Sequence, residues 1–152
     1  MRPIGCCTWI FGTNDFTAIA ARAARAGLDG VEIHGDLSMD AVQAGRILSD
    51  HGLRAFSITP GDADISHPDP AVRQGALDYY RRLVDWAVAL DHAPRVGCHG
   101  LVQRIRPVSD LTQESDLLID SVGQICAMAN AAGLDVCFEI LNRYASHQIR
   151  TV

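Results

Sequence analysis

The stretch Ala26-Gly27-Leu28-Asp29-Gly30-Val31-Glu32-Ile33-His34, residues 26–34, decides the fold, because it leads from a helix end through a glycine turn into a short apolar strand. Turns of the same kind occur at residues 51–56 and 132–136, and residues 90–96 form a variant without glycine. A glycine just past a helix end adopts the left-handed backbone conformation at the least cost. These turns are therefore interpreted as helix ends that lead into strands.

The repeated turns predict five strands that alternate with four helices. Strands are expected over residues 3–10, 30–34, 53–59, 95–99 and 135–141, and helices over residues 14–26, 39–51, 70–90 and 112–132. Ser38 and Asp69 are expected to cap the second and third helices, with Pro70 in the first helical position of the third. Such alternation predicts an α/β fold of parallel strands, formed as one domain by residues 1–152.

Composition narrows the class of protein. The chain has 152 residues, of which 48% are hydrophobic, and its net charge is −5 with no lysine. Because the arginines are scattered among aspartates and form no basic stripe, nucleic acid is not expected as a partner. No signal peptide and no membrane-spanning run is recognisable, so we expect a cytoplasmic protein without a membrane partner. The five cysteines show no CxxC spacing and are interpreted as reduced core residues.

The loops that follow the strands are much longer than the turns that precede them. The connections over residues 59–69 and 99–111 carry several ionisable side chains, among them Asp62, Asp64, His67, Arg104 and Arg106. In parallel α/β folds, ligands bind outside the carboxyl ends of the strands, among such loops. The functional site is therefore expected at that end of the sheet.

The alternation of side chains along a strand points several polar groups into the interior. Glu32 and His34 share one face of the second strand, and Glu139 lies on the polar face of the fifth. Each is either part of a convergent site or an isolated polar residue satisfied by its neighbours. His99 is either a ligand or base or a hydrogen-bonded loop residue. Trp9 either forms the floor of a sugar pocket or packs in the core.

Residues 137–144, Cys-Phe-Glu-Ile-Leu-Asn-Arg-Tyr, resemble the fifth-strand motif of the ketose 3-epimerases, which act on sugars such as D-tagatose and D-psicose. That family belongs to the xylose isomerase-like TIM-barrel superfamily. Gly30-Val31-Glu32-Ile33 resembles the second strand of the superfamily, and residues 67–73 and 80–85 resemble its third helix. The resemblance covers the first five strands of a barrel that needs about 250 residues in all. It implies a truncated, TIM-barrel-like fold.

The resemblance also implies a chemistry. In the family, the fifth-strand glutamate binds a divalent metal, usually manganese or cobalt, and transfers a proton at C3 of a ketose through an enediolate. This role carries over to Glu139. The motif continues with a substrate-contacting glutamate where this chain has Ala145, and the family's other metal ligands lie on the sixth to eighth strands. The isolated chain is therefore expected to bind metal weakly and to be inactive.

Several alternatives follow from the same residues. Open first and fifth strands would favour self-association or pairing with a complementing chain. A hydroxypyruvate isomerase-like enzyme would use the same Glu139 on a smaller substrate. His99 followed by Glu139 also suggests an endonuclease IV-like zinc phosphodiesterase, which the acidic balance disfavours. A non-catalytic sugar-binding or assembly module is the remaining alternative, and Ala145 adds weight to it.

Overall fold

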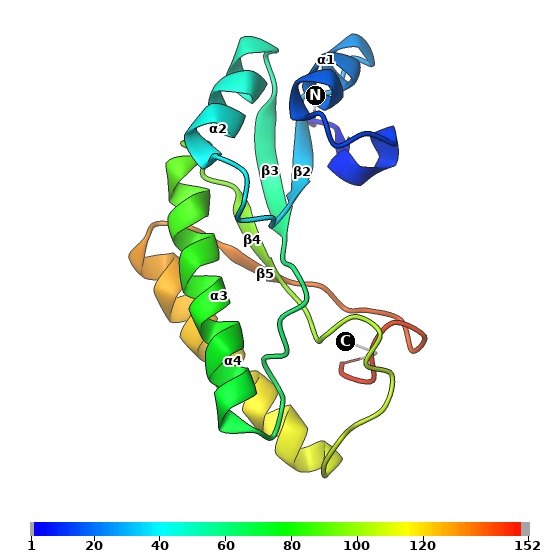
Figure 1. The fold of residues 1–152 in the computed structure, drawn as a ribbon, viewed down its shortest axis with the longest axis vertical. Helices are drawn as coiled ribbons and strands as arrows, with labels where there is room; N and C mark the ends of the chain where they lie inside the picture. Colours follow the sequence, from blue (N-terminus) through cyan, green and yellow to red (C-terminus); the bar gives the residue numbers. More distant parts are fainter. Residues whose placement is uncertain (1, 150–152) are drawn as a thin grey trace.

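The computed structural model describes residues 2–149, and it shows five parallel strands that alternate with helices (Figure 1). This confirms the predicted α/β fold. In chain order, the elements are β1 (Gly5–Cys7), the 3₁₀ helix η1 (Thr8–Phe11), α1 (Phe16–Arg25), β2 (Gly30–His34), α2 (Ala41–Asp50), β3 (Arg54–Thr59), α3 (Pro70–Ala89), β4 (Arg95–Cys98), α4 (Leu111–Ala131) and β5 (Val136–Phe138).

Each strand pairs in parallel with its neighbour in sequence, so the sheet order is β1-β2-β3-β4-β5. The helices line one side of the sheet, and the long loops extend beyond the ends of the strands (Figure 1). Val31, Ile33, Ile58 and Val96 are all at most 2% exposed, and they face the helices. Because side chains alternate along a strand, the polar residues between them, such as Glu32, point to the opposite face.

The helix starts are set by aspartates. Asp69 caps α3, as predicted, because its carboxylate accepts the Ala71 N–H at 2.8 Å, and Pro70 takes the first helical position. The prediction that Ser38 caps the second helix was wrong. Asp40 caps α2 by accepting the Gln43 N–H at 2.8 Å, while the Ser38 N–H is bound by Asp36 in the preceding turn. Both residue types make good caps, and the path of the turn decides between them.

The two outer strands are shorter than predicted. Residues 3–10 were expected as one strand, but β1 covers only Gly5–Cys7 because its pairing with β2 ends there and residues 8–11 turn into η1. The strand expected over residues 135–141 is only Val136–Phe138, since its partner β4 ends at Cys98. One further backbone bond, from Glu139 N–H to the Cys98 carbonyl at 2.8 Å, continues the pairing.

The cysteines are free, but most do not belong to the core. Cys98 alone among them is buried; Cys6, Cys7 and Cys126 are half-buried, and Cys137 is exposed. The prediction that all are core residues was therefore wrong for four of the five. Cys7 and Cys137 lie on strands next to the polar face of the sheet, which the helices do not cover. The Cys7 thiol, for example, lies 3.7 Å from a Glu32 carboxylate oxygen.

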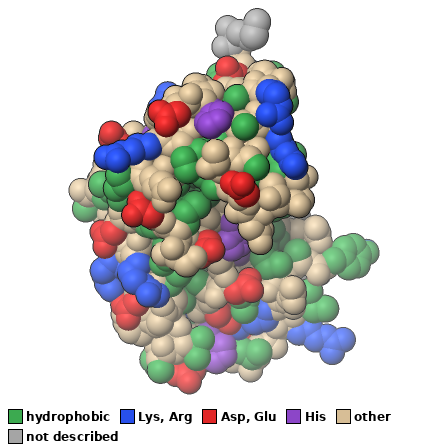
Figure 2. Space-filling view, turned by 45° about the horizontal axis from the view of Figure 1, so that its top comes forward, with side chains coloured by type: hydrophobic (Ala, Val, Ile, Leu, Met, Phe, Trp, Pro, Cys, Tyr) green, Lys and Arg blue, Asp and Glu red, His purple; other side chains and the backbone are tan. Residues whose placement is uncertain are grey.

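Acidic and basic side chains are mixed on the surface. On the face drawn in Figure 2, red and blue side chains lie near one another, and neither sign gathers into a large patch. Within residues 2–149, no helix is both long enough and apolar enough to cross a membrane.

Candidate functional site

The Glu32 carboxylate is held in place on the polar face of the sheet. Ser57 and Thr59, one strand away on β3, donate hydrogen bonds to its two oxygens at 2.5 Å and 2.8 Å, and the Cys7 thiol on β1 lies 3.7 Å from Oε1. Ser57 and Thr59 are spaced by two residues, so they share the face on which Glu32 lies. These bonds fix the carboxylate and leave it as an acceptor with remaining lone pairs.

Glu139 follows directly after β5, at the carboxyl end of the sheet. Its backbone is fixed by the bond to the Cys98 carbonyl, while its side chain is exposed and forms no hydrogen bond or ion pair with residues 2–149. Glu139, Glu32 and His99 line one cavity of about 190 Å³. The structure therefore brings together three of the predicted site residues.

The charges of the two carboxylates raise the pKa values of the nearby thiols of Cys7 and Cys137. Partial burial raises the pKa of the Cys137 thiol, and the negative charge of Glu32 raises it further. Arg95 then lowers this pKa, and Glu139 raises it by the smallest of these effects. Burial likewise raises the pKa of the Cys7 thiol, followed by the charge of Glu32 and its hydrogen bond with that carboxylate. The polar face is thus a region of negative potential, suited to cations or to hydroxyl donors.

His99 is buried at the end of β4. Its Nδ1 lies 2.8 Å from the Gly100 carbonyl oxygen, which can only accept, so Nδ1 carries the proton. The interpretation of His99 as a hydrogen-bonded loop residue is therefore confirmed for this nitrogen. In the neutral ring, the other nitrogen is an acceptor, and His99 still lines the cavity.

Trp9 and His34 lie in a neighbouring hollow. Their rings meet edge to face with centroids 6.5 Å apart, and both residues line a hollow of about 360 Å³ together with the start of α1. Both side chains are exposed, so Trp9 is not a core residue. The structure does not bring them into the cavity of Glu32 and Glu139, although β2 carries both Glu32 and His34.

A divalent metal would need more ligands than this face offers. Within residues 2–149, no group of three or more histidine, cysteine, aspartate or glutamate side chains is arranged to hold a metal ion. Manganese prefers about six oxygen or nitrogen donors. The described residues therefore do not form a complete metal site, and Glu139 and Glu32 supply at most two carboxylates.

A second polar group, which we call the anchoring cluster, lies buried under the long loops. It consists of Asp64, Arg104, Glu114 and His147. Arg104 contacts Asp64 at 3.1 Å and Glu114 at 2.9 Å, and His147 Nε2 lies 2.8 Å from the same Glu114 oxygen. The cluster joins the β3–α3 loop, the β4–α4 loop, α4 and the segment after β5.

The sequence did not identify Glu114 or His147 as important. For Glu114 a signal existed, because Glu114, Leu118, Ser121 and Ile125 are buried on one helical face of α4. A glutamate in an apolar helical stripe needs a partner. Asp64 and Arg104 were placed in the long loops near the expected site, but the ion pair between them was not predicted. No local pattern marks His147.

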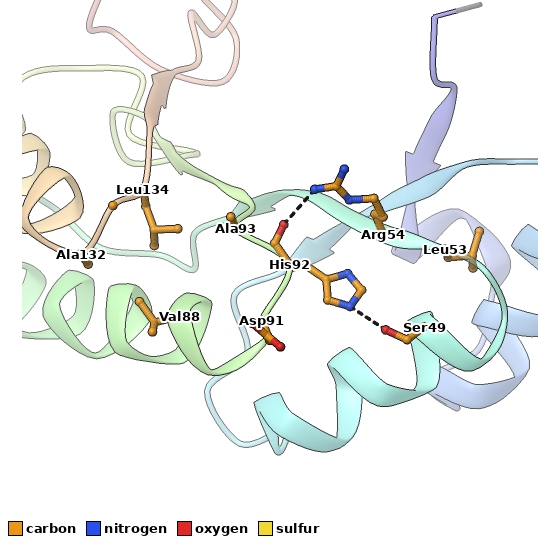
Figure 3. A pocket seen from close by; sticks show the side chains of 10 residues that line it. Ser49, Leu53, Arg54, Val88, Asp91, His92, Ala93, Ala132 and Leu134 are labelled. Carbon is orange, nitrogen blue, oxygen red and sulfur yellow. Dashed lines mark hydrogen bonds between the residues drawn. The ribbon is translucent and has the colours of Figure 1, made fainter.

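A larger hollow, of about 470 Å³, lies at the opposite end of the sheet, and we assign it no chemistry (Figure 3). His92 lines this hollow, and its ring nitrogens are engaged in hydrogen bonds with neighbouring elements. Nδ1 accepts the Ala55 N–H at 3.0 Å, and Nε2 lies 3.1 Å from both the Ser49 hydroxyl and the Gly45 carbonyl. His92 therefore ties α2 to β3.

The sequence is similar to that of known proteins. A model of the xylose isomerase-like TIM barrel family matches residues 20–152. The chain is 25% identical, over an alignment 154 positions long, to D-psicose 3-epimerase of Ruminiclostridium cellulolyticum, covering 90% of this chain and 50% of that protein. The chain thus spans about half the length of this curated relative.

Solved structures agree on the fold. The D-psicose 3-epimerase of Clostridium cellulolyticum superposes with a TM-score of 0.86 at 21% identity, covering 99% of this chain and 56% of that one. A 3-keto-D-glucoside 4-epimerase from E. coli superposes with a TM-score of 0.85 at 20% identity, covering 99% and 60%. The five strands therefore correspond to part of a TIM barrel.

Proposed function

Because the chain belongs to the xylose isomerase-like TIM barrel family, we propose that it is the part of a metal-dependent ketose 3-epimerase that carries the proton-transfer residue Glu139. The observation that supports this most is the placement of that carboxylate. It follows β5 at the carboxyl end of the sheet, its side chain is exposed, and it lines one cavity with Glu32. Ligands of parallel α/β folds bind at this end.

The proposed reaction is a proton transfer at C3 of a ketose. The Glu139 carboxylate takes the C3 proton, and the electron pair of the broken C–H bond moves toward the C2 carbonyl to give an enediolate. A second acid on the opposite face returns a proton to C3, so the configuration changes without oxidation or reduction. Glu139 is also the position that would hold manganese or cobalt, whose charge stabilises negative oxygen atoms.

The substrate contacts proposed are those of the surrounding polar groups. Glu32 is fixed by Ser57 and Thr59, and it would accept a sugar hydroxyl with its remaining lone pairs. His99 would offer its second ring nitrogen from the same cavity. Trp9 and His34, in the neighbouring hollow, would contact the far end of a sugar, since an aromatic face suits its apolar side.

The same proposal requires further polypeptide beside β5. An apolar groove runs between α4 and β5, and it is lined by Leu118, Ile119, Val122, Phe138, Ile140 and Ile149. Among the described residues, β5 pairs with β4 alone, so one edge of β5 is open to another parallel strand. The relatives are about twice as long. We assign the groove to a complementing polypeptide with the later strand-helix units; self-association through the open edge is the other outcome.

The proton-transfer role is tested by Glu139→Gln in the assembly that is active. The ketose is incubated in heavy water with manganese, and proton NMR follows loss of the C3 proton and formation of the epimer. We expect Glu139→Gln to abolish both, because glutamine keeps the shape and removes the base. Asp135→Asn, an exposed carboxylate at the start of the same segment, is the matched control and should retain turnover.

Three outcomes would overturn this proposal. Turnover of Glu139→Gln within a few-fold of the parent would remove the role of that residue. Turnover of hydroxypyruvate without turnover of ketoses would move the protein to the hydroxypyruvate isomerase-like alternative. Sugar binding without exchange at C3 would identify a non-catalytic module, for which Ala145 in place of the motif's glutamate is the supporting observation.

Metal binding by the chain alone is a separate prediction. Because Glu139 and Glu32 supply at most two of about six donors, we expect calorimetry to show weak manganese binding. Tight one-to-one binding would contradict this. It would mean that His99 or a neighbouring loop completes the site without further polypeptide.

A further inference from the structure

Both ring nitrogens of His147 face atoms that only accept hydrogen bonds. Nδ1 lies 2.8 Å from the Arg104 carbonyl oxygen, and Nε2 lies 2.8 Å from Glu114 Oε2. A carbonyl oxygen carries no hydrogen, and neither does an ionised carboxylate. A neutral imidazole has only one N–H and would satisfy one of the two contacts. Two donating nitrogens require the imidazolium form.

Glu114 must be ionised for Nε2 to need a proton, and the surroundings of Glu114 favour the ionised form. Burial acts to raise the pKa of Glu114, but the N–H groups of Ser109 and Val108, the His147 ring and the Arg104 guanidinium outweigh burial and leave the pKa below its ordinary value. Both backbone N–H groups lie 2.7 Å from Oε1. The Glu114 carboxylate therefore accepts and does not donate.

The charge balance of the anchoring cluster leads to the same conclusion independently. Asp64 and Glu114 contribute two negative charges from the β3–α3 loop and from α4, and Arg104 contributes one positive charge from the β4–α4 loop. No side chain of the cluster is more than 10% exposed. A buried net charge is strongly unfavourable. A charged His147 makes the cluster neutral.

The cluster fastens the segment that follows Glu139. The Gln103 N–H donates to the Ala145 carbonyl at 2.7 Å, and the His147 N–H donates to the Arg104 carbonyl at 3.1 Å. Glu139 thus lies between two fixed points, its own backbone bond to Cys98 and the docked residues 142–147. Loosening the second point would leave the backbone around Glu139 fixed on one side only.

We propose that His147 is a positioning residue that is held as an imidazolium and, through Glu114 and Arg104, docks residues 142–147 and so limits the movement of Glu139. The docking stands on hydrogen bonds alone. Its importance for turnover rests on the proposed role of Glu139. Loss of the ring proton would leave one nitrogen facing an acceptor without a hydrogen, and the segment would loosen.

The charge is tested on the unmodified protein by nitrogen NMR of the His147 ring at neutral pH. An imidazolium has two protonated nitrogens with similar shifts, whereas a neutral ring has one protonated and one bare nitrogen with widely separated shifts. We expect the first pattern for His147. The second pattern would overturn the proposal. This measurement needs no variant and no activity, so a failure of the proposed epimerase function would not affect it.

The docking is tested by hydrogen exchange in His147→Gln, with His51→Gln as the control. Glutamine offers a donor without charge, so we expect the amides of Ala145 and Ser146 to exchange about ten to a hundred times faster, as for loss of a hydrogen bond to a charged group. His51 lies at the end of α2, where its ring contacts the Ile47 carbonyl, and its replacement should leave these amides unchanged. Unchanged exchange in His147→Gln would overturn the docking role.

Discussion

Replacing Glu114 by glutamine tests the electrostatics of the anchoring cluster most directly. The carboxylate accepts hydrogen bonds from Arg104, His147, the Val108 N–H and both the N–H and the hydroxyl of Ser109. Glutamine has nearly the same shape, but one of its two ends is an NH₂ donor. Whichever way the amide is turned, it places a donor against donors and leaves the charge of the cluster unbalanced.

The expected loss follows from burial. Removing one partner of a buried ion pair costs about 3–5 kcal/mol, because the remaining charge is left uncompensated in the interior. For a domain of this length, each kcal/mol moves the melting temperature by about 2–4 °C. We therefore expect Glu114→Gln to melt roughly 6–20 °C below the parent at pH 7, measured by circular dichroism. Asp116→Asn removes an exposed carboxylate from the same helix and should change stability by at most about 0.5 kcal/mol.

The dependence on pH gives a second readout. The folded-state pKa of Glu114 lies below its ordinary value of 4.5, which the unfolded chain retains. Its contribution is therefore fully present above about pH 5, and it is lost as the pH falls through the folded pKa. The parent should lose stability in acid more steeply than Glu114→Gln, and the two curves should converge. Equal melting temperatures at pH 7, or equally steep acid limbs, would refute the reasoning.

Two further predictions concern packing and the carboxylates of the cavity. Gly45→Ala should lower the melting temperature, because a Cβ there would overlap the backbone carbonyl of Leu90. Gly123→Ala has open space around it and should raise the melting temperature, because alanine is favoured over glycine in a helix by about 1 kcal/mol of folding free energy. Reversed signs of the two changes would contradict the packing of α2. Glu32→Gln should lower the pKa of the Cys137 thiol, measured by alkylation rate against pH, while the thiol of Cys6, whose pKa is raised by burial alone, should not change.

The sequence allowed the arrangement of elements to be predicted, but not the lengths of the outer strands. Glycine turns at Gly27, Gly52 and Gly133 have positive φ angles, as expected for helix ends, and such local signals can be read from residue types. Strand length instead depends on where a partner ends. Cys98 closes β4 and thereby shortens β5, and only the three-dimensional register shows this.

The candidate site was predictable to a similar degree. The alternation of side chains along the strands predicted that Glu32 and Glu139 both point into the interior, and the structure brings both to one cavity. Whether these residues act as proposed stays a prediction. The contact between Glu114 and His147 joins residues 33 positions apart through loops of irregular path. No periodic pattern encodes such a contact, although the helical stripe of α4 marked Glu114 as buried.

The two carboxylates of the cavity, Glu32 and Glu139, differ in the number of hydrogen bonds that their oxygens already accept. We propose different roles for them on this basis. Ser57 and Thr59 donate to Glu32, which is thereby fixed in orientation and has fewer free lone pairs. Glu139 has both oxygens open within the described chain, on a backbone fixed at Cys98. Proton transfer needs an unoccupied lone pair on a positioned group. This difference supports the proposal that Glu139 is the proton acceptor and that Glu32 orients a hydroxyl.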